Sequence, residues 1–216
     1  GGWDNATYHL GDEMLIRLPR GEAYALKVPK EQTLLTQLGK LLSIPIPKPL
    51  ALGRPSRDYP FYWSIYKYLE GESANSVRLS DTELENIATD LATFLKELHK
   101  INTKDAPLPG LHNYWRGEHV SVYECGALKY FYQLRGIIDS NKAISLWEKA
   151  AATKWVDHPV WVHGDLASGN FLIKDGALAA VIDFGGCAIG DPSCDLTLAY
   201  TFFKGKSREV FRKQVN

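Results

Sequence analysis

Short runs of apolar and β-branched residues mark the first part of the chain. Two of them, over 6–10 and 14–18, flank a Gly-Asp pair, and this pattern predicts a β-hairpin. A longer aromatic run over 61–69 ends beside a Glu-Gly pair and predicts another strand, and a shorter strand is expected over 50–52. These segments indicate a small antiparallel sheet near the start of the chain.

Apolar residues at helical spacing appear once among these strand segments and are frequent in the rest of the chain. Leucines recur at helical spacing after Pro29 and predict a helix, and the proline-rich stretch 44–49 is expected to be an extended connector. A capping box at 80–83 precedes a long apolar stripe that ends near His99, which we interpret as a structural residue. Further helices are expected around 123–138 and 142–153 and after Asp195, with Asp191 and Asp195 interpreted as loop-fixing residues.

A polar loop between two predicted strands carries the residues of greatest chemical interest. The apolar run 160–162 leads into this loop, which covers 163–170, and a strand over 171–173 follows. A Lys-Asp-Gly turn then predicts a hairpin whose second strand ends at Asp183. Such a hairpin brings the loop before it and the carboxylate after it to the same edge.

Asp165, Asn170 and Asp183 are therefore expected to converge. Asn170 follows Asp165 by 5 residues, and Asp183 follows Asn170 by 13 and opens an Asp-Phe-Gly triplet. In kinase-type phosphoryl transfer, one Asp positions or deprotonates the attacking hydroxyl, an Asn in the same loop binds Mg²⁺, and the Asp of the triplet holds the metal that bridges the phosphates. Mg²⁺ takes oxygen ligands, which this trio supplies. In the alternative interpretation, the first two side chains only cap turns and Asp183 ends a buried strand.

The combined pattern resembles a known family. It consists of His-Gly-Asp-Leu-x-x-x-Asn over 163–170, Ile-Asp-Phe-Gly over 182–185 and Gly-Asp-Pro-Ser-Cys-Asp-Leu over 190–196. These motifs are similar to those of the aminoglycoside phosphotransferase family, the small-molecule branch of the protein-kinase-like fold. Protein kinases carry Arg where Gly164 stands, and no Ala-Pro-Glu motif follows Asp183, so a protein kinase is disfavoured.

The resemblance covers nearly the whole chain and implies an α+β, bilobal protein-kinase-like fold. A nucleotide-binding lobe over 1–69, with a small antiparallel sheet and one helix, would end in a hinge and be followed by a mainly helical catalytic lobe over 70–216. The resemblance implies that Asp165 is the catalytic base and that Asn170 and Asp183 are the Mg²⁺ ligands. ATP or GTP would then phosphorylate a hydroxyl of a small molecule, because relatives with these motifs act on aminoglycosides, macrolides, choline, homoserine and sugars. Family chains usually continue with further helices, so we expect a fragment or a shortened substrate lobe.

Two cations compete for the role of phosphate-binding residue. Lys27 follows an Ala-Leu pair as in protein-kinase strands, but it lies only 4 residues before Glu31, which would put both on one helix. Arg17 lies on the second hairpin strand, 14 residues before Glu31, which leaves room for a connector. We therefore expect Arg17 to contact the α- and β-phosphates and Glu31 to be its ion-pair partner. The alternative is that Arg17 solubilises an edge strand and Glu31 is a first-turn helix carboxylate.

The end of the aromatic strand resembles the hinge of kinase-like folds, whose backbone recognises the purine edge. This implies that Lys67, Tyr68 and Leu69 lie against the base and that Tyr66 lies at the rear of the pocket. Simple strand packing is the alternative for the start of this run. A Gly-rich turn over 1–5 is similar to a phosphate-binding turn of the family, and it is equally consistent with a frayed terminus.

Prolines and glycines among aromatic residues predict a long loop over 101–122. In the family this region lies near the acceptor site. It is therefore either a wall of the acceptor pocket or an ordinary surface loop, and we favour the surface loop.

Composition narrows the choice of partners. The 25 basic and 25 acidic residues cancel, so no global field favours nucleic acid or an anionic membrane surface. The 3 cysteines lack C-x-x-C spacing, which argues against a disulfide framework or a zinc site and favours the cytoplasm. No apolar run approaches the roughly 18 residues of a membrane span, and no signal peptide is visible.

A catalytically inactive nucleotide-binding regulatory module is the second hypothesis for this chain.

Overall fold

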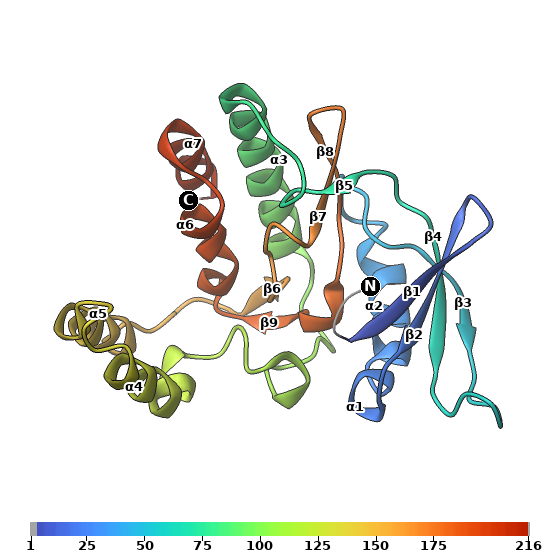
Figure 1. Ribbon diagram of the computed structural model, residues 1–216, viewed down its shortest axis with the longest axis horizontal. Helices are drawn as coiled ribbons and strands as arrows, with labels where there is room; N and C mark the ends of the chain where they lie inside the picture. Colours follow the sequence, from blue (N-terminus) through green and yellow to red (C-terminus); the bar gives the residue numbers. More distant parts are fainter. Residues whose placement is uncertain (1–3, 216) are drawn as a thin grey trace.

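The computed structural model describes residues 4–215, and its first lobe is built around a four-stranded antiparallel sheet (Figure 1). The order is β1-β2-β4-β3, with β1 over Asn5–Leu10, β2 over Met14–Pro19, β3 over Pro49–Gly53 and β4 over Trp63–Lys67. The predicted hairpin is present, since β1 pairs with β2 in antiparallel register. Strand β4 lies between β2 and β3, so the aromatic run has a paired strand on each side.

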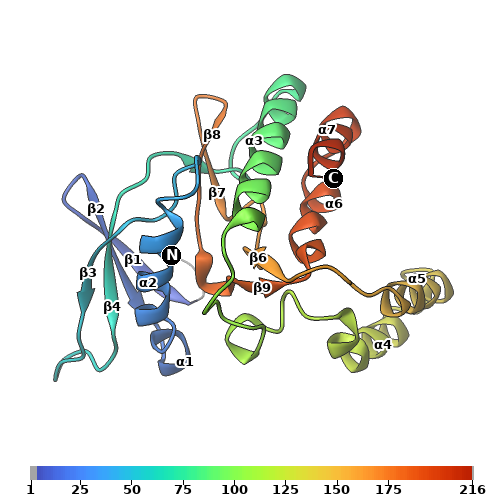
Figure 2. The ribbon, with the colours of Figure 1, turned by 180° about the vertical axis from the view of Figure 1, so that it is seen from behind.

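A helix covers one face of this sheet (Figure 2). It is α2, over Val28–Leu38, and it packs against β3 and β4 through the buried leucines that follow Pro29. A single turn, α1 over Glu22–Ala25, precedes it and adds to the one helix that the periodicity predicts in this lobe. The apolar face of α2 explains why the sheet is stable, because a sheet needs a partner that buries one of its faces.

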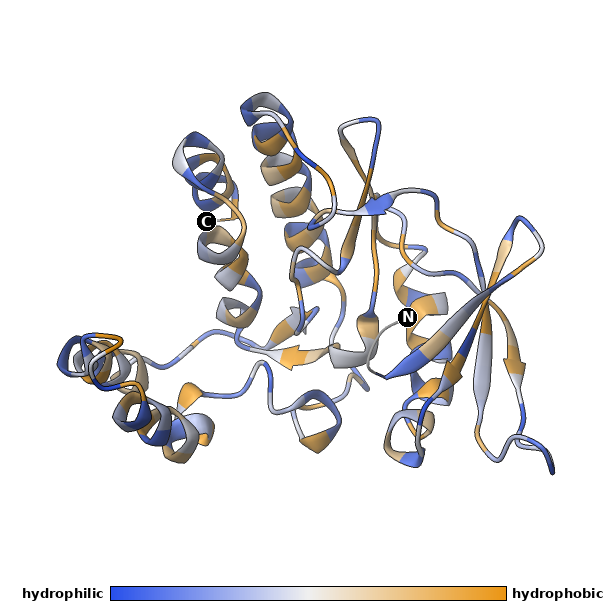
Figure 3. Cartoon of the chain, in the orientation of Figure 1, coloured by the Kyte–Doolittle hydropathy of each residue, from blue (hydrophilic) through white to orange (hydrophobic). Residues whose placement is uncertain are grey.

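The second lobe is organised around α3, over Asp81–Lys100. Its predicted capping box is present: Glu83 N donates to Ser80 Oγ at 3.3 Å, and Ser80 N donates to Glu83 Oε2 at 2.7 Å. The apolar stripe of α3 is fully buried, and α3 packs against α7, over Gly205–Val215 (Figure 3). A helix with this apolar stripe gains its stability mainly from such packing.

Two small antiparallel sheets complete the end of this lobe that carries the 163–170 loop. In one, β5 over Glu72–Ser73 pairs with β7 over Phe171–Lys174, and β7 pairs with β8 over Ala177–Val181. In the other, β6 over Val160–Val162 pairs with β9 over Ala188–Gly190. The predicted hairpin is present, and its loop is the two residues Asp175 and Gly176, whose φ values of 51° and 76° suit such a turn.

The remaining helices are short. Helices α4 over Glu124–Gln133 and α5 over Ser140–Ala152 pack against each other and project from the lobe (Figure 1). The first is shorter than predicted, because the chain turns at Gly136, where φ is 85°. The segment after Asp191 begins as a 3₁₀ helix and continues as an α-helix, rather than starting directly as one. The 3₁₀ and α elements are η1 Leu111–Asn113, η2 Val120–Tyr123, η3 Phe184–Gly186, η4 Pro192–Thr197 and α6 Leu198–Thr201.

One hydrophobic core connects the two lobes. It includes buried residues of α2, β4, α3, β7, β8 and α7. The proline-rich connector joins it as an extended segment, and Val181 N donates to Pro45 O at 3.0 Å. Within residues 4–215, no helix is both long enough and apolar enough to cross a membrane.

Candidate active site

A cavity of about 820 Å³ lies between the sheet and the β7–β8 hairpin. Arg17 and Tyr66 line it from the sheet, and Asp165, Asn170 and Asp183 line it from the second lobe. The segment 67–69, which joins the lobes, also lines it. Apart from Glu31, which contacts Arg17, the site residues that the sequence singled out therefore meet at one cavity.

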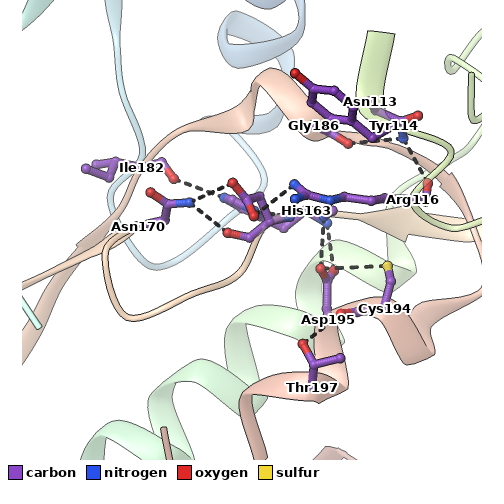
Figure 4. Close-up of polar contacts among 12 residues, drawn as sticks. Asn113, Tyr114, Arg116, His163, Asn170, Ile182, Gly186, Cys194, Asp195 and Thr197 are labelled. Atoms are coloured by element: carbon purple, nitrogen blue, oxygen red, sulfur yellow. Dashed lines mark hydrogen bonds and ion pairs between the residues drawn. The ribbon is translucent and has the colours of Figure 1, made fainter. Parts of the chain in front are cut away.

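The loop before β7 is fixed from beneath by a buried carboxylate (Figure 4). Asp195 is 0% exposed, and its two oxygens accept from His163 N at 2.7 Å and from Gly164 N at 2.9 Å. Burial raises the pKa of the Asp195 carboxyl, while His163 and the two N–H groups act in the opposite direction. Asp195 thus holds the loop by its backbone, in agreement with its interpretation as a loop-fixing residue.

Gly164 occupies a position that has no room for a side chain. Its φ is 78°, and a Cβ atom there would lie 2.3 Å from Gly186 O. Left-handed backbone already disfavours other residues, and this contact excludes them without movement of one backbone segment. The structure therefore gives a physical reason why glycine, and not the arginine of protein kinases, precedes Asp165.

The ring of His163 connects the loop to the strand that carries Asp183. Asp165 N donates to His163 Nδ1 at 3.2 Å, so the other ring nitrogen, Nε2, carries the proton and donates to Ile182 O at 3.0 Å. Ile182 N in turn donates to Asn170 O at 2.8 Å. This chain of contacts places Asp183 beside the loop.

Each carboxylate oxygen of Asp165 contacts a nitrogen atom of another side chain, one in a hydrogen bond and the other in an ion pair. Asn170 Nδ2 donates to Asp165 O at 2.8 Å and to Asp165 Oδ2 at 3.2 Å, and Arg116 Nη1 lies 2.8 Å from Asp165 Oδ1. The Asp165 side chain is nevertheless 41% exposed, so a molecule in the cavity can reach it. Each carboxylate oxygen has two lone pairs and can accept a further hydrogen bond.

Asn170 and Asp183 have the donor atoms that Mg²⁺ requires. With its Nδ2 directed at Asp165, Asn170 has its amide oxygen left to face a cation, and the Asp183 side chain is 47% exposed. In residues 4–215 no group of three or more His, Cys, Asp and Glu side chains is arranged to hold a metal. Mg²⁺ is commonly bound by one or two carboxylates together with substrate phosphates and water, so this sparse set fits it.

Arg17 lies between Glu31 and Asp183. Its Nη1 atom is 3.3 Å from Glu31 Oε1, and its Nη2 atom is 3.9 Å from Asp183 Oδ1. Burial raises the pKa of Glu31, and the guanidinium acts against that rise. Burial likewise raises the pKa of Tyr66, whose ring lies 5.8 Å from Arg17 Cζ. Lys27 lies instead at the start of α2, as the spacing argument predicts, with its Nζ 5.4 Å from the Tyr114 ring.

The connecting segment has two of its amides already engaged. Lys67 N donates to Lys48 O at 2.9 Å, and Tyr68 N donates to Glu13 O at 2.7 Å. Among the described residues, the N–H of Leu69 has no backbone acceptor, so it is the amide of segment 67–69 that could donate to a purine edge. The Gly-rich turn that the sequence suggested at 1–5 lies mostly outside the described residues.

The favoured interpretation of 101–122 as an ordinary surface loop was wrong. Tyr114 and Arg116 from this segment line the cavity, and Arg116 contacts Asp165. No motif or spacing indicated Arg116, because the contact joins segments that are remote in the sequence. The sequence feature that could have indicated a pocket wall was the presence of aromatic and basic residues in this Pro/Gly-rich loop.

Solved structures of phosphotransferases share this fold. The GDP and kanamycin complex of APH(2")-IIIa has a TM-score of 0.76 and 21% identity, with 100% of this chain and 75% of that chain covered. The streptomycin-ATP-APH(2")-IIa ternary complex has a TM-score of 0.68 and 23% identity, covering 100% and 74%. Macrolide 2'-phosphotransferase MphH from Brachybacterium faecium has a TM-score of 0.65 and 20% identity, covering 100% and 77%. The predicted α+β, kinase-like fold class is thereby confirmed.

Sequence comparisons give the family. A search of curated proteins found no match. A family model described as the phosphotransferase enzyme family matches residues 1–216, the full length of the sequence. The resemblance read from the motifs is therefore confirmed, and the chain belongs to the phosphotransferase enzyme family.

Proposed function

We propose that this protein transfers the γ-phosphate of ATP or GTP to a hydroxyl group of a small molecule. The observation that carries the proposal is the convergence of Asp165, Asn170 and Asp183 at a cavity that Arg17 also lines. Three oxygen-bearing side chains opposite a guanidinium suit the hydroxyl, the metal ion and the phosphates of a kinase-type reaction. Membership of the phosphotransferase family supports the same chemistry.

In the proposed reaction, the acceptor oxygen attacks the γ-phosphorus while the bond from that phosphorus to the β,γ-bridging oxygen breaks. The hydroxyl proton passes to the carboxylate of Asp165, and the products are a phosphate ester and ADP or GDP. Asn170 orients that carboxylate through the contact of 3.2 Å between Nδ2 and Oδ2. Positioning and electrostatics would supply most of the rate enhancement.

The nucleotide is proposed to lie along the sheet side of the cavity. Arg17, held by Glu31 at 3.3 Å, would contact the α- and β-phosphates, and 67–69 would lie against the base with Tyr66 behind it. Asn170 and Asp183 would hold Mg²⁺, which offsets negative charge on the phosphates when bound. This arrangement corresponds to a nucleotide-binding lobe over 1–69 and a catalytic lobe over 70–216.

The solved structures suggest the classes of donor and acceptor. They include complexes with GDP, ADP or ATP and with kanamycin, gentamicin or streptomycin, and two of them are macrolide 2'-phosphotransferases. We therefore propose an aminoglycoside, a macrolide or a related antibiotic or metabolite as acceptor. The proposed setting is the cytoplasm, where ATP and GTP are available.

The test is an acceptor screen with matched variants. The purified chain is incubated with Mg²⁺, ATP or GTP and a panel of aminoglycosides, macrolides and small polyols, and phosphorylated products are identified by mass spectrometry. Asp165→Asn is expected to lower the rate of transfer by at least about 100-fold, because it removes the proton acceptor. Asp175→Asn makes the same chemical change in the β7–β8 turn and serves as the control.

Two results would contradict the proposal. Transfer at the wild-type rate in Asp165→Asn would remove Asp165 from the mechanism. A thermal shift with nucleotide and Mg²⁺, without any phosphorylated product, would support the inactive nucleotide-binding module instead.

A further inference from the structure

Arg116 reaches the proposed catalytic carboxylate from a segment that no motif marks. Its Nη1 atom lies 2.8 Å from Asp165 Oδ1, while Asn170 Nδ2 lies 3.2 Å from Oδ2. Figure 4 shows Arg116 and Asn170 pointing toward each other from opposite sides. The two oxygens of one carboxylate are therefore contacted from two separate parts of the chain, one by the ion pair with Arg116 and the other by the hydrogen bond from Asn170.

A buried asparagine fixes the segment that carries Arg116. Asn113 is 1% exposed, its Oδ1 accepts from Gly110 N at 2.9 Å, and its Nδ2 donates to Arg116 O at 2.8 Å and to Gly186 O at 3.3 Å. The same side chain thus ties the Arg116 backbone to the segment that follows Asp183. Buried side-chain amides with all groups satisfied define one backbone arrangement.

The backbone on either side of Arg116 is constrained as well. Tyr114 and Trp115 have φ of 56° and 61°, a left-handed conformation that non-glycine residues adopt rarely. After Arg116, Gly117 O accepts from Asp191 N at 2.8 Å, and a Cβ atom at Gly190 would lie 2.1 Å from that oxygen. Strained conformations persist where the surroundings enforce them, and they are frequent at functional sites.

The surroundings also guide the side chain itself. A Cβ atom at Gly164 would lie 3.6 Å from Arg116 Cβ, so the arginine lies directly beside this glycine. The Tyr114 ring lies 5.8 Å from Arg116 Cζ, and Tyr123 Oη donates to Tyr114 O at 2.6 Å. Backbone and aromatic contacts together therefore direct this guanidinium toward Asp165.

We propose that Arg116 is a positioning residue that holds the Asp165 carboxylate in the orientation in which it receives the acceptor hydroxyl. This inference rests on the proposed function. A planar guanidinium restricts rotation of a carboxylate, and the oxygen it contacts keeps a second lone pair for another hydrogen bond. Without Arg116, Asp165 would stay in the cavity and sample more rotamers, so fewer molecules would be ready to react.

The test compares Arg116→Ala and Arg116→Lys with Arg135→Ala. Arg135 is a matched control, because its Cζ atom also lies over a tyrosine ring, at 4.4 Å from that of Tyr132. It follows just after α4, which projects from the lobe away from the β7–β8 hairpin (Figure 1). Arg116→Ala is expected to lower kcat by about 100-fold while the KM for nucleotide changes by less than about 3-fold. Arg116→Lys should recover part of the loss, and added guanidinium ion should partly rescue the alanine variant. Circular dichroism checks that each variant is folded.

A second measurement needs no activity. The carboxyl carbon resonance of Asp165 in isotope-labelled protein is expected to move in Arg116→Ala and to stay in place in Arg135→Ala. An unmoved resonance in folded Arg116→Ala, or an unchanged kcat, would overturn the inference. A wild-type chain without transfer activity would refute the proposed function alone, and the resonance would then decide whether Arg116 holds Asp165.

Discussion

Gly164→Ala tests how the catalytic loop packs against the segment after Asp183. Gly164 has a φ of 78°, and the added Cβ would lie 2.3 Å from Gly186 O and 3.1 Å from Gly186 C. Because a backbone carbonyl cannot rotate away as a side chain can, one of the two segments must shift by about 1 Å to restore an ordinary contact. The substitution therefore adds steric conflict to the cost of left-handed backbone.

The loss of stability follows from these two contributions. An alanine in left-handed backbone costs about 1–2 kcal/mol relative to glycine. The shift also weakens the buried hydrogen bond from Gly164 N to Asp195 (2.9 Å) and the partly buried one from Asn113 to Gly186 O (3.3 Å). A buried group left without its partner costs about 1–3 kcal/mol. We expect a total of about 2–5 kcal/mol, which lowers the Tm by roughly 10 °C in a chain of this length.

Gly136→Ala measures the conformational cost without the steric conflict, so the difference between the two variants gives the steric part. Gly136 has a φ of 85°, and among the described residues no atom lies within 4 Å of the Cβ position. It should therefore lose only about 1–2 kcal/mol, the conformational contribution. Urea unfolding of both variants gives the two free energies, and the transfer rate of Gly164→Ala should fall by about 100-fold because the loop carrying Asp165 moves. Equal loss of stability in the two variants, with activity retained, would refute this account of the loop.

Three further predictions follow from the site and the core. Arg17→Ala is expected to raise the KM for nucleotide by about 10-fold or more, because it removes charge-assisted contacts to the phosphates; an unchanged KM in steady-state kinetics would contradict the phosphate role. Iodoacetamide should modify the exposed Cys125 in the native protein and leave Cys187 unmodified until the protein unfolds, because burial raises the pKa of the Cys187 thiol and keeps it protonated. Peptide mass spectrometry reports the modification of both cysteines, and early modification of Cys187 would contradict its burial. Burial lowers the pKa of His99 below its ordinary value of 6.5, so the unfolded chain protonates this histidine more readily than the folded chain does. The free energy of unfolding should therefore fall as the pH drops below 6.5. His99→Gln should reduce this pH dependence in urea titrations, and an identical slope would contradict it.

Local patterns in the sequence determined much of the fold. The Gly-Asp pair between two β-prone runs predicted the β1–β2 hairpin, and the capping box at 80–83 predicted the start of α3. The sequence also predicted those parts of the site in which the separation between two residues limits where they can lie. The separation of 14 residues between Arg17 and Glu31 left room for a connector that brings them together, and the hairpin after 170 brought Asp183 beside the loop. Their roles with nucleotide and Mg²⁺ stay predictions.

Tertiary structure alone decided what surrounds Asp165. The contact of Arg116 with Asp165, and the burial of Asp195 under His163 and Gly164, join segments that are remote in the sequence. Periodicity and turn residues report only on neighbours along the chain, so they carry no trace of such contacts. These contacts form when β9 and the 101–122 segment pack beside the catalytic loop, because that packing sets where each backbone, and hence each side chain, can lie.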